Sequence, residues 1–168
     1  MEIYNKISSK KSYTQYWIGI TACIILGLIL VSAGMGKLFA NLPNETEFFE
    51  QLAPIFSITE NESKLIAYAL PWVEIVAGLL LLLQIWPSIV AIIMCVPLCI
   101  GFATNNIWMI MSGVEYESCN LCFGQLEILL GSLTPIQALI FDAVLLMLIL
   151  IVVFINPKYK LLYGLFDK

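Results

Sequence analysis

Long apolar runs separated by short polar segments dominate the pattern of the chain. A helix needs roughly 20 apolar residues to cross about 30 Å of hydrocarbon. Four runs meet this requirement, at residues 16–40, 65–84, 88–111 and 135–155. Pro87 stands between the second and third runs, where it ends one helix and allows the next to begin, so a tight hairpin is expected there. The pattern predicts an all-α integral membrane protein, a four-transmembrane-helix bundle.

The composition agrees with this interpretation. Hydrophobic residues make up 61% of the 168 residues and charged residues only 12%, with a mean hydropathy of +0.94, far from the values of soluble domains. The four spans use most of the length, so residues 1–168 are expected to form a single membrane domain. The first run resembles a signal peptide, but it exceeds the roughly 7–15 apolar residues of one, which favours an uncleaved anchor.

The charged residues predict the orientation of the bundle, because lysines collect on the cytoplasmic side during insertion. The segments 41–64 and 113–134 are instead rich in glutamate, so both are expected to face outward, and both termini are expected to be cytoplasmic. An even number of spans is consistent with two cytoplasmic ends. The lysines that flank the first and last spans are Lys6, Lys10, Lys11, Lys158, Lys160 and Lys168.

Two residue types are missing from the sequence, and each absence excludes a class of function. The chain has no histidine, which excludes His-ligated haem, His-based zinc sites and nucleophiles activated by an imidazole. It also has no arginine, so nothing indicates a nucleic-acid partner, and the lipid bilayer is the partner that the sequence requires.

Cys119 and Cys122 form a CxxC motif in the second outward segment. This spacing allows one thiol to attack a partner disulfide and the other to resolve the mixed species, and disulfides persist outside the cytosol. The alternative to exchange is a static disulfide between Cys119 and Cys122 that has only a structural role in the segment. Metal binding is the weakest option, because two thiols alone do not close a zinc site. The remaining cysteines, inside the first and third spans, are expected to act as small hydrophobic residues: Cys23, Cys95 and Cys99.

Polar residues inside the spans cost free energy of insertion, so their presence indicates a structural or functional role. Five of them lie between about 6 and 15 Å from the outward ends of their spans, at 1.5 Å per residue. Since the helices alternate in direction, these positions converge at one depth and predict a polar pocket that opens toward the CxxC side. Two alternatives remain open, namely a purely structural ion pair between Lys37 and Glu74 or a ligand or proton site. The five residues are Lys37, Glu74, Asn105, Asn106 and Asp142.

Short motifs in three of these regions resemble a known family. GMGKLF at 34–39 and LPWVEIVAGLLLLL at 70–83 resemble the Gly-Lys and Pro…Glu…Gly signatures of DoxX-like four-helix membrane proteins, and CFG at 122–124 with Asp142 resembles the MauE branch. This chain has one more residue between its thiols than the CxCFG of that branch, and Phe141 where an arginine is usual. The resemblance implies a bundle in the bacterial plasma (inner) membrane with a role in redox or disulfide maturation of exported proteins.

The sequence therefore predicts a redox-associated multi-pass membrane protein whose outward, periplasmic or extracellular CxxC exchanges disulfides with a thioredoxin-like or substrate protein. The alternatives are a non-catalytic accessory subunit of a membrane complex with a structural disulfide, and a bundle that binds a quinone or another small molecule. No cofactor is required by the sequence, and quinone is the candidate that the second alternative names.

Overall fold

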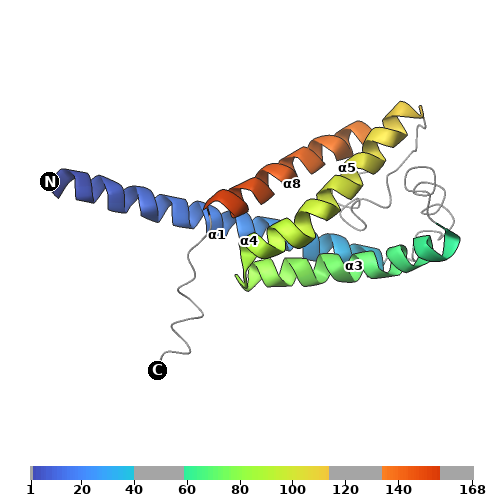
Figure 1. Ribbon diagram of the computed structural model, residues 1–168, viewed down its shortest axis with the longest axis horizontal. Coiled ribbons are helices and arrows are strands. Elements are labelled where there is room, and N and C mark those ends of the chain that lie inside the picture. Colours follow the sequence, from blue (N-terminus) through green and yellow to red (C-terminus); the bar gives the residue numbers. More distant parts are fainter. Residues whose placement is uncertain (1, 40–58, 114–133, 156–168) are drawn as a thin grey trace, which may run out of the picture.

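A computed structural model describes residues 2–39, 59–113 and 134–155 of the chain (Figure 1). Within these residues all regular structure is helical and no β-strand occurs. The third span combines a short α-helix, a π-helical segment and a longer α-helix. The elements are α1 (Glu2–Phe39), α3 (Glu60–Leu82), α4 (Pro87–Val90), the π-helix η1 (Ala91–Cys95), α5 (Val96–Met111) and α8 (Pro135–Ile155).

Among the residues that the structure describes, four helical stretches are long and apolar enough to cross a membrane, which confirms the predicted four-helix architecture. They are Thr14–Leu38, Lys64–Leu82, Pro87–Met111 and Pro135–Ile155. The predicted bounds differ from these by at most two residues at each end. The helix α1 itself starts much earlier, at Glu2, so the helix continues into the N-terminal segment beyond the first span.

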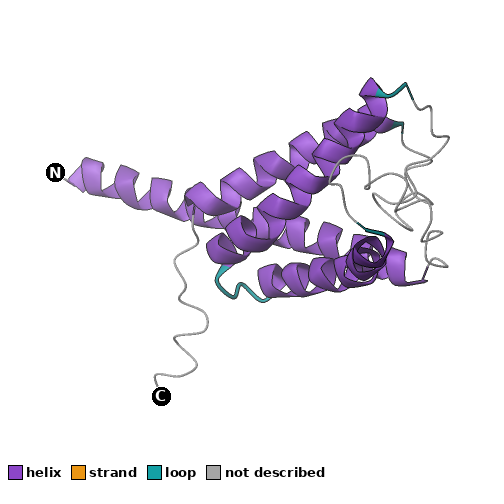
Figure 2. Ribbon diagram, turned by 45° about the vertical axis from the view of Figure 1, so that its right-hand side comes forward, coloured by secondary structure: helices purple, strands orange, loops and turns teal. Residues whose placement is uncertain are grey.

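The helices alternate in direction along the bundle (Figures 1 and 2). The start of α1, the hairpin between α3 and α4, and the end of α8 lie at one end of the molecule. The other end carries the end of α1, the start of α3, the end of α5 and the start of α8, and these border the segments 40–58 and 114–133. The helix α1 packs against α3 and α8, and α5 packs against α8.

The helix α3 ends in a Schellman-type motif, which leads into the hairpin to α4. Gln84 adopts the left-handed conformation with φ 57°, and the Ile85 N–H donates to the Leu80 carbonyl at 2.9 Å, so the last carbonyls of α3 are satisfied. Pro87 then starts α4, where its missing N–H costs nothing. The sequence prediction of a proline-defined hairpin is confirmed.

The π-helix η1 lies just before Pro97 in the third span. The Val96 N–H donates to the Ala91 carbonyl, five residues earlier. A proline has no N–H to offer the preceding turn, and a π-turn is a local adjustment that membrane helices use to re-satisfy the backbone. Cys95 and Cys99, four residues apart across the junction of η1 and α5, are both buried in the core.

A capping box starts α3 outside the membrane span. The Thr59 hydroxyl accepts from the Glu62 N–H, and the Glu62 carboxylate accepts from the Thr59 backbone N–H at 2.8 Å. These hydrogen bonds from Thr59 lower the pKa of the exposed Glu62 carboxyl below its ordinary value. The start of α3 is thereby fixed at the bundle end that carries the two long connections.

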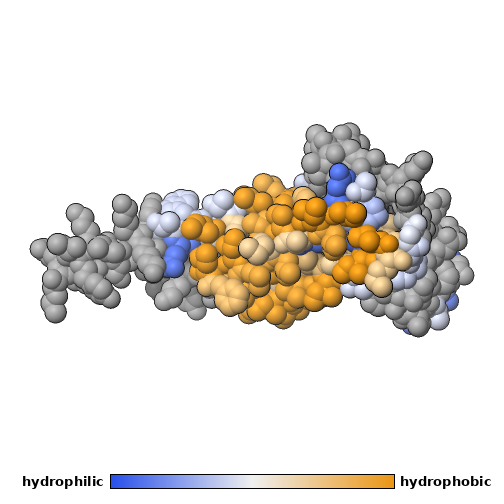
Figure 3. Space-filling model, turned by 90° about the horizontal axis from the view of Figure 1, so that it is seen from above, coloured by the Kyte–Doolittle hydropathy of each residue, from blue (hydrophilic) through white to orange (hydrophobic). Residues whose placement is uncertain are grey.

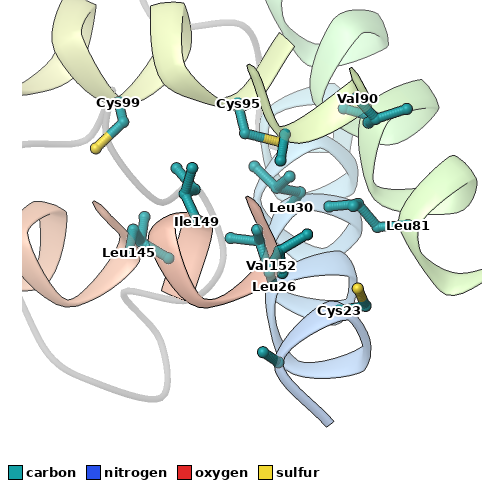
Figure 4. Packing of buried hydrophobic residues seen from close by; sticks show 13 residues of the cluster. Cys23, Leu26, Leu30, Leu81, Val90, Cys95, Cys99, Leu145, Ile149 and Val152 are labelled. Atoms are coloured by element: carbon teal, nitrogen blue, oxygen red, sulfur yellow. The ribbon is translucent and has the colours of Figure 1, made fainter. Parts of the chain in front are cut away.

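The core lies where α1, α3 and the third span meet α8 (Figure 4). Apolar side chains that face outward instead form a band across the middle of the bundle in the view of Figure 3, as expected for a lipid-facing surface. The buried core cluster consists of Ala22, Cys23, Leu26, Leu30, Ala77, Leu81, Val90, Ala91, Cys95, Cys99, Leu145, Ile149 and Val152.

Candidate functional site

All five polar residues that the sequence singles out inside the spans are buried, and we call them the polar set. They come from four different helical spans and lie toward the bundle end that carries the two long connections. Their exposed fractions are 5% for Lys37, 1% for Glu74, 8% for Asn105, 0% for Asn106 and 2% for Asp142. None of the five side chains therefore faces lipid, and each must find its partners inside the protein.

The first contact within the polar set joins α1 to α3. Lys37 Nζ donates to Glu74 Oε1, and the two groups form the ion pair that the sequence predicts. Close packing of the two helices makes this contact possible. A Cβ atom added to Gly34 would lie 2.6 Å from the Pro71 carbonyl oxygen, so the α1 backbone approaches α3 one turn before Lys37 more closely than a larger residue permits.

The second contact joins α5 to α8. Asn106 Nδ2 donates to Asp142 Oδ2 at 2.7 Å, which gives the buried carboxyl group a hydrogen-bond donor. Two turns deeper on α5, Cys99 Sγ lies 3.4 Å from the Asp142 backbone oxygen, within reach of a weak S–H hydrogen bond. Asp142 of α8 is thus contacted by two α5 residues, Asn106 at its side chain and Cys99 at its backbone.

Phe102 connects the two helix pairs. Its ring centroid lies 4.7 Å from Lys37 Nζ, a cation–π contact between α5 and α1. Phe102 is one turn before Asn106 on the same side of α5. Sequence reasoning missed this residue, because a phenylalanine in an apolar span looks like any other lipid-facing or core position. The available signal was its spacing, four residues before one predicted polar position and three before the other.

Two oxygens of the polar set are buried acceptors without a hydrogen-bond partner among the described residues. They are Glu74 Oε2 and Asn105 Oδ1. The Asn105 amide nitrogen makes only a weak contact, to Met109 Sδ at 3.5 Å. A buried acceptor that lacks a donor costs free energy, and more so where lipid rather than water surrounds the protein. The set therefore has unused capacity to accept hydrogen bonds.

The cysteines fall into two groups. Cys119 and Cys122 lie outside the described residues, so their proposed exchange chemistry remains a prediction. Cys23, Cys95 and Cys99 are free thiols in the apolar core, which agrees with the expectation that they act as small hydrophobic residues (Figure 4). Within the described ranges no group of three Cys, Asp, Glu or His side chains is arranged to hold a metal ion.

The chain was compared with curated proteins, solved structures and protein families. No curated protein and no solved structure matches the chain. Residues 15–155, however, match the model of the family described as methylamine utilisation protein MauE. The resemblance to DoxX-like proteins is not tested by this match and stays a prediction. Because the matched region runs through all four spans of the bundle, the chain belongs to the MauE family of multi-pass membrane proteins.

Proposed function

We propose that the chain is a membrane component of thiol–disulfide exchange, with Cys119 and Cys122 as its reactive pair. One observation supports the proposal: the CxxC lies in sequence between Met111 and Pro135, and these two helix ends lie at the bundle end opposite the start of α1. With the lysine-rich start of α1 in the cytoplasm, that end faces the oxidising side of the membrane.

The exchange conserves atoms and electrons. The thiolate of one cysteine attacks a sulfur of the partner's disulfide, an S–S bond to the partner forms, and the partner's other sulfur leaves as a thiolate. The second cysteine then attacks the mixed disulfide and releases the reduced partner. Two electrons and two protons pass from Cys119 and Cys122 to the partner, and the chain is left with a disulfide. The reverse sequence oxidises a partner dithiol.

Cys119 is the proposed attacking thiol, because it lies on the polar side of the motif, whereas Cys122 adjoins Phe123. Glu115 and Glu117 are close in sequence, and negative charge disfavours a thiolate, so the activating charge must come from elsewhere. The family description names methylamine utilisation, and the partner proposed here is an exported protein of that process that needs disulfide formation or reduction. The DoxX-like signatures around Lys37 and Glu74 agree with a redox-associated bundle.

The experiment uses the two single variants Cys119→Ser and Cys122→Ser, expressed in the native membrane. Removal of the resolving thiol should trap a mixed disulfide, so Cys122→Ser is expected to give adducts with envelope proteins on non-reducing gels, and reductant should remove them. The buried thiol variant Cys95→Ser is the matched control and should give no adduct. If neither Cys119→Ser nor Cys122→Ser forms an adduct and both only lose thermal stability, the pair is a structural disulfide and the proposal fails.

A further inference from the structure

We propose that the polar set binds a lipid-soluble molecule that donates hydrogen bonds, with an aromatic diol such as a hydroquinone as the representative class. The observation behind this inference is a pair of acceptors, Glu74 Oε2 and Asn105 Oδ1, that have no hydrogen-bond partner in the described part of the chain and belong to side chains more than nine-tenths buried. The inference concerns binding and involves no thiol chemistry, so it stands apart from the exchange function proposed above.

The two acceptors belong to one neighbourhood. Glu74 is held by Lys37, and Lys37 lies over the ring of Phe102. Around α5, Asn105 lies about 60° from Phe102 on one side and Asn106 about 40° on the other. Since Asn106 contacts α8, Asn105 lies on the side of Phe102 that is turned away from α8. Its acceptor therefore lies on the side of α5 away from α8, one turn from Phe102, the residue whose ring contacts Lys37.

The two open groups of the neighbourhood are acceptors, so a donor is what each of them lacks. The Lys37 ammonium donates to the Glu74 carboxylate and lies over the Phe102 ring, and the Asn106 amide donates to Asp142. A ligand that only accepts hydrogen bonds, such as an oxidised quinone, would leave both open acceptors unsatisfied. A molecule with two hydroxyl groups supplies two donors for two acceptors. This reasoning selects the reduced form over the oxidised one.

The surroundings determine the rest of the ligand's chemistry. The site lies within the spans, so its ligand must enter from lipid or from the loop end of the bundle and must be largely apolar. The Phe102 ring and the fully buried Met109 offer an aromatic and a polarisable surface, both of which suit an aromatic ring. A purely structural role explains Asn105 poorly, because an apolar residue there would avoid the cost of a buried, unpaired oxygen.

The test measures thermal unfolding of the purified full-length chain in detergent, in the Cys119→Ser/Cys122→Ser double variant so that no reactive pair converts the probes. The probes are a short-chain alkyl hydroquinone under anaerobic conditions, its dimethyl ether and the corresponding quinone. The hydroquinone should raise the unfolding midpoint in proportion to the logarithm of its concentration. The ether, which lacks both donors, and the quinone should raise it far less.

Substitutions locate the effect. Asn105→Leu should weaken hydroquinone binding about tenfold, as expected for one lost hydrogen bond, while leaving the unliganded protein as stable or more so. Thr104→Val is the matched control, because the Thr104 hydroxyl donates to the Ile100 carbonyl of its own helix. The proposal is overturned if the ether or quinone stabilises equally, if Asn105→Leu binds unchanged, or if no probe stabilises the protein. Should Asn105→Leu fail to fold, the comparison of the hydroquinone with its dimethyl ether tests the proposal by itself.

Discussion

Lys37 and Glu74 are two opposite charges in the interior of a membrane protein, each almost completely buried. Burial makes an isolated charge expensive, and removal of one member of a buried pair leaves the other uncompensated. The pair also joins α1 to α3 at the loop end of the bundle. At the scale of single residues, we expect the loss of this contact to lower the stability of the protein most.

A double-mutant cycle tests this pair. Glu74→Gln should leave the buried Lys37 ammonium without a counter-charge. It should therefore lower the free energy of unfolding by about 3–5 kcal/mol, measured by thermal unfolding in detergent. Addition of Lys37→Met to Glu74→Gln should recover part of the loss, because no unpaired charge remains. Glu62→Gln is the control, since that carboxylate is exposed and glutamine also serves in a capping box. Simple additivity of the two single losses would show that the residues are not coupled.

At the scale of elements, the contact between α1 and α3 depends on small residues. A Cβ atom added to Gly78 would lie 2.7 Å from the Gly27 carbonyl oxygen and 2.9 Å from the Val31 backbone nitrogen. Distances this short involve backbone, which cannot rotate away as a flexible side chain can. The glycines are therefore required by close helix packing.

Alanine substitutions separate packing from helix propensity. Gly78→Ala should destabilise the bundle by about 1–3 kcal/mol, the usual cost of overpacking. Gly101→Ala is the matched control, because its added Cβ meets no atom within 4 Å and should be neutral or stabilise α5 by up to about 1 kcal/mol. Unfolding midpoints in detergent measure both. Equal effects of the two substitutions would mean that the α1–α3 contact is not close in the membrane.

At the scale of the whole molecule, the alternation of four helices brings the helix ends that border the segments 40–58 and 114–133 to one end of the bundle. The side of the membrane that this end faces is a prediction from the lysines. The structure offers a clean way to test it, since Cys23, Cys95 and Cys99 are at most 5% exposed and should contribute little background in thiol labelling.

Labelling of reduced, right-side-out vesicles with an impermeant thiol reagent should modify Cys119 or Cys122. The Cys119→Ser/Cys122→Ser double variant should remain unlabelled. The expected signal appears without permeabilisation, because outward loops are open to the medium. A signal that needs permeabilised vesicles would reverse the orientation and remove the oxidising environment on which the exchange function depends.

The sequence by itself determined the number of spans, their bounds to within about two residues, and the buried polar positions. The physical reason is that a bilayer imposes a fixed length on apolar helices and a high cost on polar side chains, so both stand out in a single chain. The pairing of Lys37 with Glu74 followed from the same cost, because a buried charge requires an opposite charge on a neighbouring helix.

Only the tertiary structure decided the rest. The link from Lys37 to Phe102, the bond from Asn106 to Asp142 and the open oxygens of Glu74 and Asn105 depend on which helices meet and at what rotation. The π-turn before Pro97 and the close approach of α1 and α3 at Gly34 and Gly78 are likewise features of the folded bundle. Such contacts join residues far apart in the chain, and the apolar periodicity of a membrane helix hardly distinguishes the face that meets another helix from the face that meets lipid.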